Sequence, residues 1–222
     1  MKISILSMTS NPIETLYRGY KVCVSKYTPT EVKIPRIDNT LGMPIDYDKM
    51  IDLIKRHINH ESVLEHVNFT FSIEGVSRSL LAQLTRHRLA SFSVQSQRYV
   101  CGENFAFVIP ETIKNNPEML KEFNNHINMT KIRYKKMIDS GIPKEDARSI
   151  LPNATTTNVV MTMNLRELRH FYDERSCIHA QKEIRQLANK MMDLVKEKLI
   201  FADFEARKCG KTCFECVNKN IR

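Results

Sequence analysis

The spacing of apolar residues predicts a strand and a helix early in the chain. In the segment VNFTFSIE, residues 67–74, apolar side chains alternate with polar ones, which is the period of a strand with one buried face. Residues 2–6 alternate in the same way and predict a short first strand. Three prolines predict a loop over residues 28–45. From Asp46 a spacing of three and four residues predicts an amphipathic helix with a face formed by Tyr47, Met50, Ile51, Ile54 and Ile58.

The next segments predict a capped helix, a loop and a further strand. Ser77 is placed to cap a helix, because serine at this position accepts a hydrogen bond from a free backbone N–H group. That helix runs into Arg86–Arg88 and is followed by an irregular loop. The segment FAFVIP, residues 105–110, predicts a strand. The apolar face of the helix consists of Leu80, Leu81 and Leu84.

A long helix is predicted after residue 116. Asn116 can cap it, and Pro117 suits a first turn in which the backbone N–H has no partner. Gly141 is placed to end it. The predicted apolar face consists of Leu120, Phe123, Ile127, Tyr134 and Met137 or Ile138.

The last third of the chain completes an α+β pattern. Residues 155–163 favour a strand. Asn164 and Glu167 have the spacing of a capping box, which predicts a helix that ends at Arg175. The strands and helices together predict one α+β domain over residues 1–205, followed by a cysteine-containing tail over residues 206–222. The apolar face of the last helix consists of Ile184, Leu187, Ala188, Met191 and Val195.

Composition predicts a globular protein of the cytoplasm with an anionic partner. Of 222 residues, 42% are hydrophobic and 27% are charged, and no run approaches the ~18 apolar residues of a membrane span. The first residues lack the features of a signal peptide, so we expect a cytoplasmic location and no membrane partner. The 34 basic and 25 acidic side chains give a net charge of +9, which favours nucleic acid, nucleotides or phosphorylated metabolites.

The excess positive charge is concentrated in one segment. Between Gly75 and Gly102 there is no Asp, Glu or Lys, whereas the stretch RHRLASFSVQSQRY, residues 86–99, holds three arginines. Arginine binds phosphate oxygens two at a time, so the segment favours an anion site. The alternative is a basic helix end that complements the helix dipole, which leaves Ser96 and Arg98 unexplained.

Motifs for metals and for phosphate loops are weak. The chain has six glycines and neither a GxGxxG nor a Walker motif, so side chains must supply the donors for any bound nucleotide. The segment HESVLEH, residues 60–66, lacks the HExxH spacing and favours a capped turn over a metal site. Without a signal peptide the six cysteines favour reduced thiols. Cys209, Cys213 and Cys216 could hold zinc, but no fourth ligand lies near them, so we expect no metal.

A second cationic cluster lies between residues 164 and 181. On a helix, Arg166, Arg169 or His170, and Asp173 lie near one another. The alternative is a solvated face with local ion pairs, Arg166 with Glu167 and Arg169 with Asp173. The cluster alone does not separate these two interpretations.

Four ordered blocks resemble the flavin-dependent thymidylate synthases. The first is the signature itself, Arg86-His87-Arg88, seven residues and then Ser96. HESVLEH with the strand after it, ARSILP at 147–152, and N-x-R-x-x-x-H at 164–170 with ERSCIHAQKEI at 174–184 are similar to other segments of that family in order and spacing. The resemblance covers about residues 60–185, with a weaker echo at residues 21–26, and the tail lies outside the family pattern.

The resemblance implies a fold, an assembly and a reaction. It implies a mixed or antiparallel sheet flanked by helices, assembled as a homotetramer whose active sites combine residues of several subunits. It implies conversion of deoxyuridine monophosphate (dUMP) to thymidine monophosphate (dTMP). The co-substrate 5,10-methylenetetrahydrofolate gives the carbon and leaves as tetrahydrofolate, and FAD, reduced by NADPH, delivers hydride. An arginine-rich pocket suits these anionic ligands, and the chemistry requires neither a metal nor a cysteine nucleophile.

The resemblance also implies a role for individual residues. Arg175 is the catalytic residue, which meets the uracil ring and stabilises charge as it develops there. The residues implied for FAD are His60, Ser62, Arg86, His87, Arg88, Val94, Asn164, Arg166 and His170. The residues implied for dUMP are Gln83, Arg86, Ser96, Gln97, Arg98, Arg148 and Arg175. Ser93, Val94 and Gln97 depart from the residue types common in the family, and Val94 can contribute only backbone contacts.

Two other classes of protein share some of these features. A single-strand nucleic-acid binder would use the arginines on the backbone and stack bases on Phe92 and Tyr99. A flavoprotein reductase without methyl transfer would bind flavin but not dUMP. We expect no nucleic-acid partner, and a bound flavin whose visible spectrum responds to dUMP separates the first interpretation from both alternatives.

Overall fold

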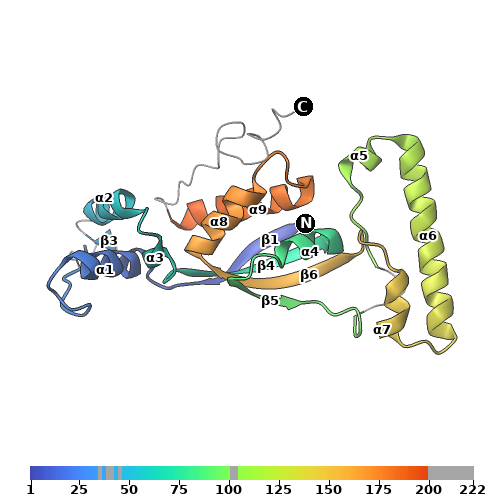
Figure 1. Ribbon diagram of the computed structural model, residues 1–222, viewed down its shortest axis with the longest axis horizontal. Coiled ribbons are helices and arrows are strands. Elements are labelled where there is room, and N and C mark those ends of the chain that lie inside the picture. The colour runs from blue at the N-terminus through green and yellow to red at the C-terminus, as the bar shows by residue number, and fades with distance from the viewer. Residues whose placement is uncertain (35–36, 39–42, 45–46, 101–104, 200–222) are drawn as a thin grey trace, which may run out of the picture. The chain divides into compact units, whose positions relative to one another are not determined.

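The computed structural model is an α+β fold, as the sequence predicts, and describes residues 1–34, 37–38, 43–44, 47–100 and 105–199 (Figure 1). The predicted cysteine tail and Cys101 lie outside these residues. The strands are β1 (Lys2–Met8), β2 (Ile37–Asp38), β3 (Met43–Pro44), β4 (Asn68–Ser77), β5 (Ala90–Val94) and β6 (Thr156–Asn164). The helices are α1 (Pro12–Val24), α2 (Tyr47–His57), α3 (Glu61–Leu64), α4 (Arg78–Leu84), α5 (Glu111–Lys114), α6 (Pro117–Asp139), α7 (Lys144–Ala147), the 3-10 turn η1 (Arg148–Ile150), α8 (Leu165–Arg175) and α9 (Lys182–Lys198).

The main sheet is antiparallel and has four strands in the order β1-β4-β6-β5. Leu165 at the end of β6 donates its backbone N–H to the carbonyl of Val67 at the start of β4, over 2.7 Å. Towards the other end, the N–H of Gly75 in β4 donates to the side chain of Asn158 in β6. Residue numbers therefore run in opposite directions along this pair. A separate antiparallel pair, β2 and β3, lies within the predicted loop over residues 28–45.

The apolar periodicity of the sequence produces the core. In β4 the side chains of Phe69, Phe71 and Ile73 are fully buried and alternate with partly exposed ones. The predicted faces of α2, α4 and α9 are largely buried. Each large side chain removed from water in this way contributes about 1.5–3 kcal/mol, which exceeds the propensity terms of the short elements.

The caps that the sequence predicts are present. The hydroxyl of Ser77 accepts from the N–H of Leu80 at the start of α4, and the side chain of Asn116 accepts from Met119 at the start of α6. Gly141 follows α6 with a φ of +82°, a backbone conformation that favours glycine. These positions fix the helix ends independently of tertiary packing.

Three segments differ from the prediction. Residues 90–94 form β5 instead of an irregular loop, because Ala90, Phe92 and Val94 alternate with serines and meet the edge of β6. The segment 105–110 is no strand and keeps one isolated bridge, between Phe107 and Thr155. Helix α1 is absent from the prediction, although Ile13, Leu16, Tyr17 and Tyr20 have the spacing of an amphipathic helix and Leu16 and Tyr20 are buried.

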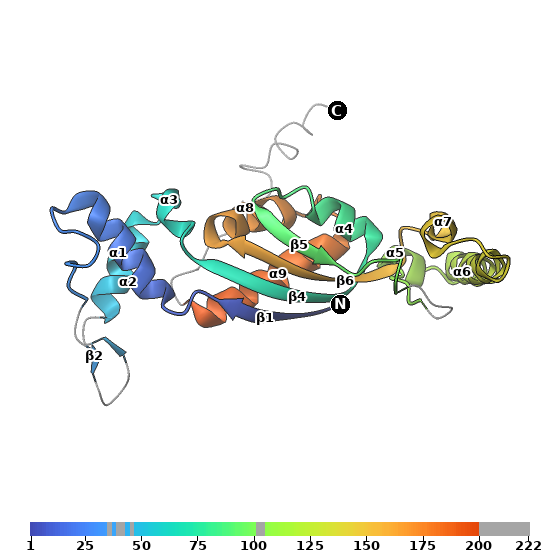
Figure 2. The same cartoon turned by 90° about the horizontal axis from the view of Figure 1, so that it is seen from below.

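The chain divides into two compact units, each built from discontinuous segments. Unit 1 comprises residues 1–3, 72–86 and 92–161, and unit 2 comprises residues 4–71, 87–91 and 162–222. Within unit 1, α6 lies beside α5 and α7. Within unit 2, α1 lies beside α2, and α8 beside α9, in both views (Figures 1 and 2). The single domain over residues 1–205 stays a prediction.

Gly19 allows α1 to approach α3 closely. A Cβ at position 19 would lie 2.6 Å from Cγ1 of the buried Val63. We expect Gly19→Ala to destabilise the protein, because an overpacking cost of about 1–3 kcal/mol exceeds the gain of about 1 kcal/mol in helix propensity. Chemical unfolding of Gly19→Ala, Val63→Ala and the double variant measures the coupling. The double variant should be more stable than the sum of the single effects predicts, and simple additivity would contradict this contact.

Candidate active site

The arginine–histidine–arginine segment separates into two exposed cations and a buried imidazole. It lies between the end of α4 and the start of β5. Arg86 and Arg88 are exposed, whereas His87 retains 5% of its accessible surface. Within the described part of the chain, neither guanidinium makes a hydrogen bond or ion pair. Two arginine side chains are therefore available to a ligand.

The imidazole of His87 is held on both of its nitrogens by residues of α8. Its Nδ1 lies 3.1 Å from Oε1 of Glu167, which is also buried. Its Nε2 lies 3.0 Å from Nε of Arg175. The ring of Phe171 packs edge-on against it, with centroids 4.9 Å apart. His87, Glu167, Phe171 and Arg175 all belong to unit 2 and form one cluster, in which the first three are buried and Arg175 is half-buried.

The partners of His87 determine its tautomer. The Nε–H of Arg175 can only donate, so Nε2 of His87 must accept and its proton must lie on Nδ1. Nδ1–H then donates to the carboxylate of Glu167. Burial lowers the pKa of His87, the charges of Arg175 and His170 lower it further, and the hydrogen bond to Glu167 opposes them. The imidazole is therefore neutral near pH 7.

Helix α8 brings these partners together through its own geometry. Glu167, Phe171 and Arg175 are four residues apart, so they lie along one side of the helix. The side chain of Asn164 accepts from the N–H of Glu167 over 2.8 Å, which is the predicted cap. In a complete capping box, the carboxylate of Glu167 would accept a hydrogen bond from the backbone N–H of Asn164. Here that carboxylate binds His87 instead.

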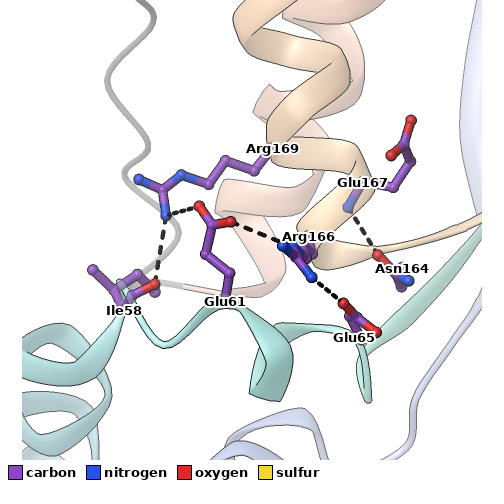
Figure 3. Close-up of polar contacts among 7 residues, drawn as sticks. All are labelled: Ile58, Glu61, Glu65, Asn164, Arg166, Glu167 and Arg169. Carbon is purple, nitrogen blue, oxygen red and sulfur yellow. Dashed lines mark hydrogen bonds and ion pairs between the residues drawn. The ribbon is translucent and has the colours of Figure 1, made fainter. Parts of the chain in front are cut away.

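A second row of α8 side chains meets the segment HESVLEH (Figure 3). Arg166 forms ion pairs with Glu61, at 3.3 Å, and with Glu65. Arg169 lies 3.6 Å from the carboxylate of Glu61 and donates to the carbonyl of Ile58. The hydrogen bond that Arg166 donates to the Glu65 carboxylate raises the pKa of Arg166. The alternative of a local ion pair between Arg166 and Glu167 is not what the structure shows, since Arg166 pairs with Glu61 and Glu65, and Glu167 with His87.

Three further residues implied for FAD are exposed in unit 2. Ser62 lies on α3 between the two carboxylates that hold Arg166. His60 precedes that helix, and its ring meets His57 edge-on at 5.8 Å. His170 lies on α8, with its ring 5.8 Å from that of His87. These three side chains are accessible to a ligand. Both ring nitrogens of His87 are already bound, so the predicted contact of His87 with FAD could be made only by its backbone.

The residues implied for dUMP lie mainly in unit 1, where Glu145 joins two of them. Nε of Arg98 lies 2.8 Å from the Glu145 carboxylate, and Nε of Arg148 donates to the Glu145 carbonyl over 3.0 Å. The hydroxyl of Ser96 accepts from the N–H of Arg98 and closes a turn after β5. Gln83 donates from α4 to the carbonyl of Ser79. The structure thus brings Ser96, Arg98 and Arg148 together.

A small recess and a larger groove lie among the described residues of unit 1. The small recess, of about 30 Å³, is lined by Arg78, Ser96, Gln97 and the start of β6. Val94, the last residue of β5, is half-buried and directly precedes in the sequence the residues that line this recess. A groove of about 500 Å³ is lined by Phe105, Phe107, Phe123 and Lys131 among others. None of the residues implied for a ligand lines that groove.

Comparison with known proteins identifies the family. A family model described as thymidylate synthase complementing protein matches residues 4–199. A flavin-dependent thymidylate synthase of Pyrococcus abyssi is 44% identical over 226 residues, covering 97% of this chain and 87% of that protein. One from Geobacter sulfurreducens is 40% identical over 200 residues, covering 88% and 82%. The chain belongs to the flavin-dependent thymidylate synthase family. The predicted family is confirmed, and with it the prediction that the chain is an enzyme.

The fold is also that of the family. The structure of a flavin-dependent thymidylate synthase from Helicobacter pylori, complexed with FAD and dUMP, is similar to this chain with a TM-score of 0.67. It is 24% identical, and 92% of this chain and 98% of that one are covered. Within the residues that the structure describes, no helix is long and apolar enough to cross a membrane, and no cluster of three or more potential metal ligands occurs.

Sequence reasoning missed the carboxylates that hold the residues of the candidate site. Glu167 was assigned to a cap, and Glu61, Glu65 and Glu145 were given no role toward the arginines. The segment without acidic residues meets carboxylates that lie outside it in the sequence, Glu167 at His87 and Glu145 at Arg98. The sequence signal for this cluster is the spacing of Glu167 and Arg175, which places both side chains on one side of a helix.

The buried imidazole should make stability depend on pH. Glu167, Arg175 and His170 face His87, and its folded-state pKa lies below the ordinary value of 6.5. The unfolded chain therefore binds the proton first as pH falls. The contribution of His87 to the free energy of unfolding should decrease as pH falls from 6.5 through the lowered pKa, and it should be constant above pH 6.5. Urea unfolding of the parent and of His87→Gln on both sides of pH 6.5 isolates this contribution. Parallel pH profiles for the two proteins would contradict it.

Proposed function

We propose that the chain converts dUMP to dTMP by reductive methylation, with 5,10-methylenetetrahydrofolate as carbon donor and NADPH as reductant through FAD. The overall reaction consumes dUMP, methylenetetrahydrofolate, NADPH and a proton, and it yields dTMP, tetrahydrofolate and NADP⁺. Membership of the family supports the proposal. The observation that carries it is the division of the Arg86–Arg88 segment into two exposed, unpaired arginines and a buried histidine that contacts Arg175.

The residues of the proposed flavin site fit a dianionic pyrophosphate. Arg86 and Arg88 offer guanidinium groups that face solvent, and Arg166 lies in the first turn of α8, where the helix dipole also favours negative charge. Ser62 and His170 add exposed polar groups, and Asn164 begins the same helix. When bound, FAD supplies the hydride that completes the methyl group. The protein contributes binding and orientation, since no glycine-rich phosphate loop is present in the sequence.

The proposed dUMP site uses the turn after β5. Arg98 and Arg148, both beside Glu145, hold the phosphate, and Ser96 shapes the turn through the Arg98 N–H. Gln83 and Gln97 contact the remainder of the nucleotide. Arg175 meets the uracil ring, where its terminal N–H groups stabilise negative charge on the carbonyl oxygens as carbon and hydride are transferred. The half-buried position of Arg175 strengthens that interaction.

The proposed enzyme is a cytoplasmic homotetramer whose active sites combine residues from several copies of the chain. The family resemblance supports this assembly. Its partners are dUMP, folate and the nicotinamide nucleotide, without nucleic acid or membrane.

One experiment tests the proposed function directly. The purified protein is supplied with FAD, and its visible spectrum is recorded before and after addition of dUMP. We expect a bound flavin whose bands shift with dUMP, and formation of dTMP once methylenetetrahydrofolate and NADPH are added. A protein without affinity for flavin but with salt-dependent affinity for oligonucleotides would favour the nucleic-acid binder. Flavin reduction without a response to dUMP would favour a reductase.

Arg88→Ala should weaken flavin binding. A charge-assisted hydrogen bond to the pyrophosphate is worth about 1.5–3 kcal/mol, so the dissociation constant should rise about ten- to a hundredfold. Flavin fluorescence titration of the apoprotein measures it. Arg133→Ala, which removes an exposed arginine from α6, is the matched control for loss of one positive charge. Equal flavin affinity for Arg88→Ala and the control would exclude this role.

Glu65→Gln should strengthen flavin binding severalfold. The carboxylate of Glu65 holds Arg166 and competes with a phosphate for the same guanidinium donors (Figure 3). The same titration measures the effect, with Glu118→Gln on α6 as the control for loss of a negative charge. Weaker binding in Glu65→Gln would instead show that Glu65 orients Arg166 for the flavin.

Arg98→Ala and Ser96→Ala should weaken dUMP binding more than flavin binding. Arg98 supplies a phosphate donor, and Ser96 closes the turn that carries it. Calorimetric titrations of each variant with dUMP and with FAD give the two affinities. A similar loss for both ligands would show that the turn has collapsed and that neither residue is specific for the nucleotide.

A further inference from the structure

We propose that Glu167 and His87 are positioning residues that hold the guanidinium of Arg175 for the reaction. The proposal deepens the proposed function and rests on it, since Arg175 acts on the substrate ring only if the chain makes dTMP. It also revises the part of His87, which the family resemblance implied as a contact of FAD. All three residues belong to unit 2, and two hydrogen bonds of 3.1 Å and 3.0 Å join them in series.

The side chain of Arg175 requires an external anchor. It is the last residue of α8, and the chain leaves the helix at Ser176. Asp173 and Glu174 are its acidic neighbours in the sequence, but no ion pair joins Arg175 to a carboxylate in the part of the chain that the structure describes. A long side chain with several rotatable bonds loses rotamer freedom when it is ordered, so a fixed position must be imposed from outside. His87 is the contact that does so.

The anchor is attached at the atom that leaves the working end free. Nε–H donates to His87, so the two terminal NH₂ groups remain for a ligand. Because Nε lies in the plane of the guanidinium, this bond fixes the orientation of the whole planar group. The oxyanion-type contact proposed for Arg175 depends on such preorganisation.

A neutral acceptor suits this task better than a carboxylate. An ion pair would hold Arg175 but would also offset the positive charge that the uracil carbonyl oxygens need. The imidazole accepts a hydrogen bond without carrying charge, and burial keeps it neutral. Glu167 acts one bond further away, where it holds the proton on Nδ1 and so leaves the lone pair of Nε2 for Arg175.

The packing around the ring supports a positioning role. His87 retains 5% and Glu167 6% of their accessible surface, so neither presents a side chain to substrate. Phe171 fixes the ring plane from the side at 83°. The N–H of Glu167 is bound to Asn164, so the carboxylate starts from a fixed turn of the helix.

Three variants of the holoenzyme test the proposal. His87→Phe keeps a ring of similar shape and removes the acceptor, His87→Gln keeps an acceptor at a similar position, and Glu167→Gln is isosteric but can donate to Nδ1 and drive the proton to Nε2. Each is measured for flavin content, dUMP affinity, flavin reduction by NADPH and turnover to dTMP. Glu174→Gln, an exposed position beside Arg175 with the same loss of charge, is the control.

We expect turnover to fall about ten- to a hundredfold in His87→Phe and Glu167→Gln, with flavin content, dUMP affinity and flavin reduction within about threefold of the parent. His87→Gln should recover most of the turnover, and the control should match the parent. Introduced into Arg175→Ala, the His87→Phe and Glu167→Gln changes should cause no further loss of turnover, because they act only through Arg175.

Other outcomes overturn the proposal. A further loss in the Arg175→Ala background, or an equal loss of flavin and dUMP binding, would show that the cluster is structural. Parental turnover in Glu167→Gln would show the same, and this isosteric variant decides the test if His87→Phe does not fold. A parent protein that makes no dTMP would contradict the proposed function itself, whereas an active parent with active variants contradicts only the positioning role.

Discussion

The hydrogen bonds on the two nitrogens of His87 link the local structure of the chain to its chemistry. Both partners come from one helix, so α8 must begin at Asn164 for Glu167 and Arg175 to reach the same ring. Two turns of regular helix separate these partners, with Phe171 between them against the ring. The cap, the helix and the buried imidazole therefore depend on one another. An unpaired Glu167 in this interior would be costly, and His87 removes that cost by donating to it.

The arginines of the site are neutralised in different degrees. Arg86 and Arg88 stay unpaired at the surface, Arg166 and Arg98 are held by exposed carboxylates, and Arg175 is held by a neutral ring. Exposed ion pairs are weak because water and salt screen them, so a phosphate can displace Glu65 or Glu145 from its arginine. A buried ion pair at Arg175 would resist such exchange. In the proposed mechanism Arg175 needs a constant charge and is held by a neutral ring, whereas Arg166 and Arg98, which would exchange ligands, are held by carboxylates.

Local signals in the sequence predicted much of the fold. The caps at Ser77, Asn116 and Asn164 depend on neighbours three residues away, and the burial of β4 follows from its alternation. Strand β5 was missed because two serines among its five residues, with Ser96 shortly after them, are typical of a loop until β6 provides a partner. Helix α1 was also missed, although its apolar residues Ile13, Leu16, Tyr17 and Tyr20 have helical spacing. The error at β5 has a tertiary cause, since strand pairing decides the state of a weakly patterned segment.

The arginines of the candidate site could be found from the sequence, but their partners could not. A run without carboxylates can be read directly from the sequence. By contrast, Glu167 and Arg175 are separated from His87 by 80 and 88 positions in the sequence, and Glu65 is separated from Arg166 by 101. The same limit explains why His87 was grouped with its neighbours in the signature. Arg86 lies in the turn that follows α4, where its N–H donates to the carbonyl of Gln83, so no regular period sets the direction of the three side chains. The tripeptide presents two charges to solvent, while its central residue is buried against Glu167 and Arg175 of α8.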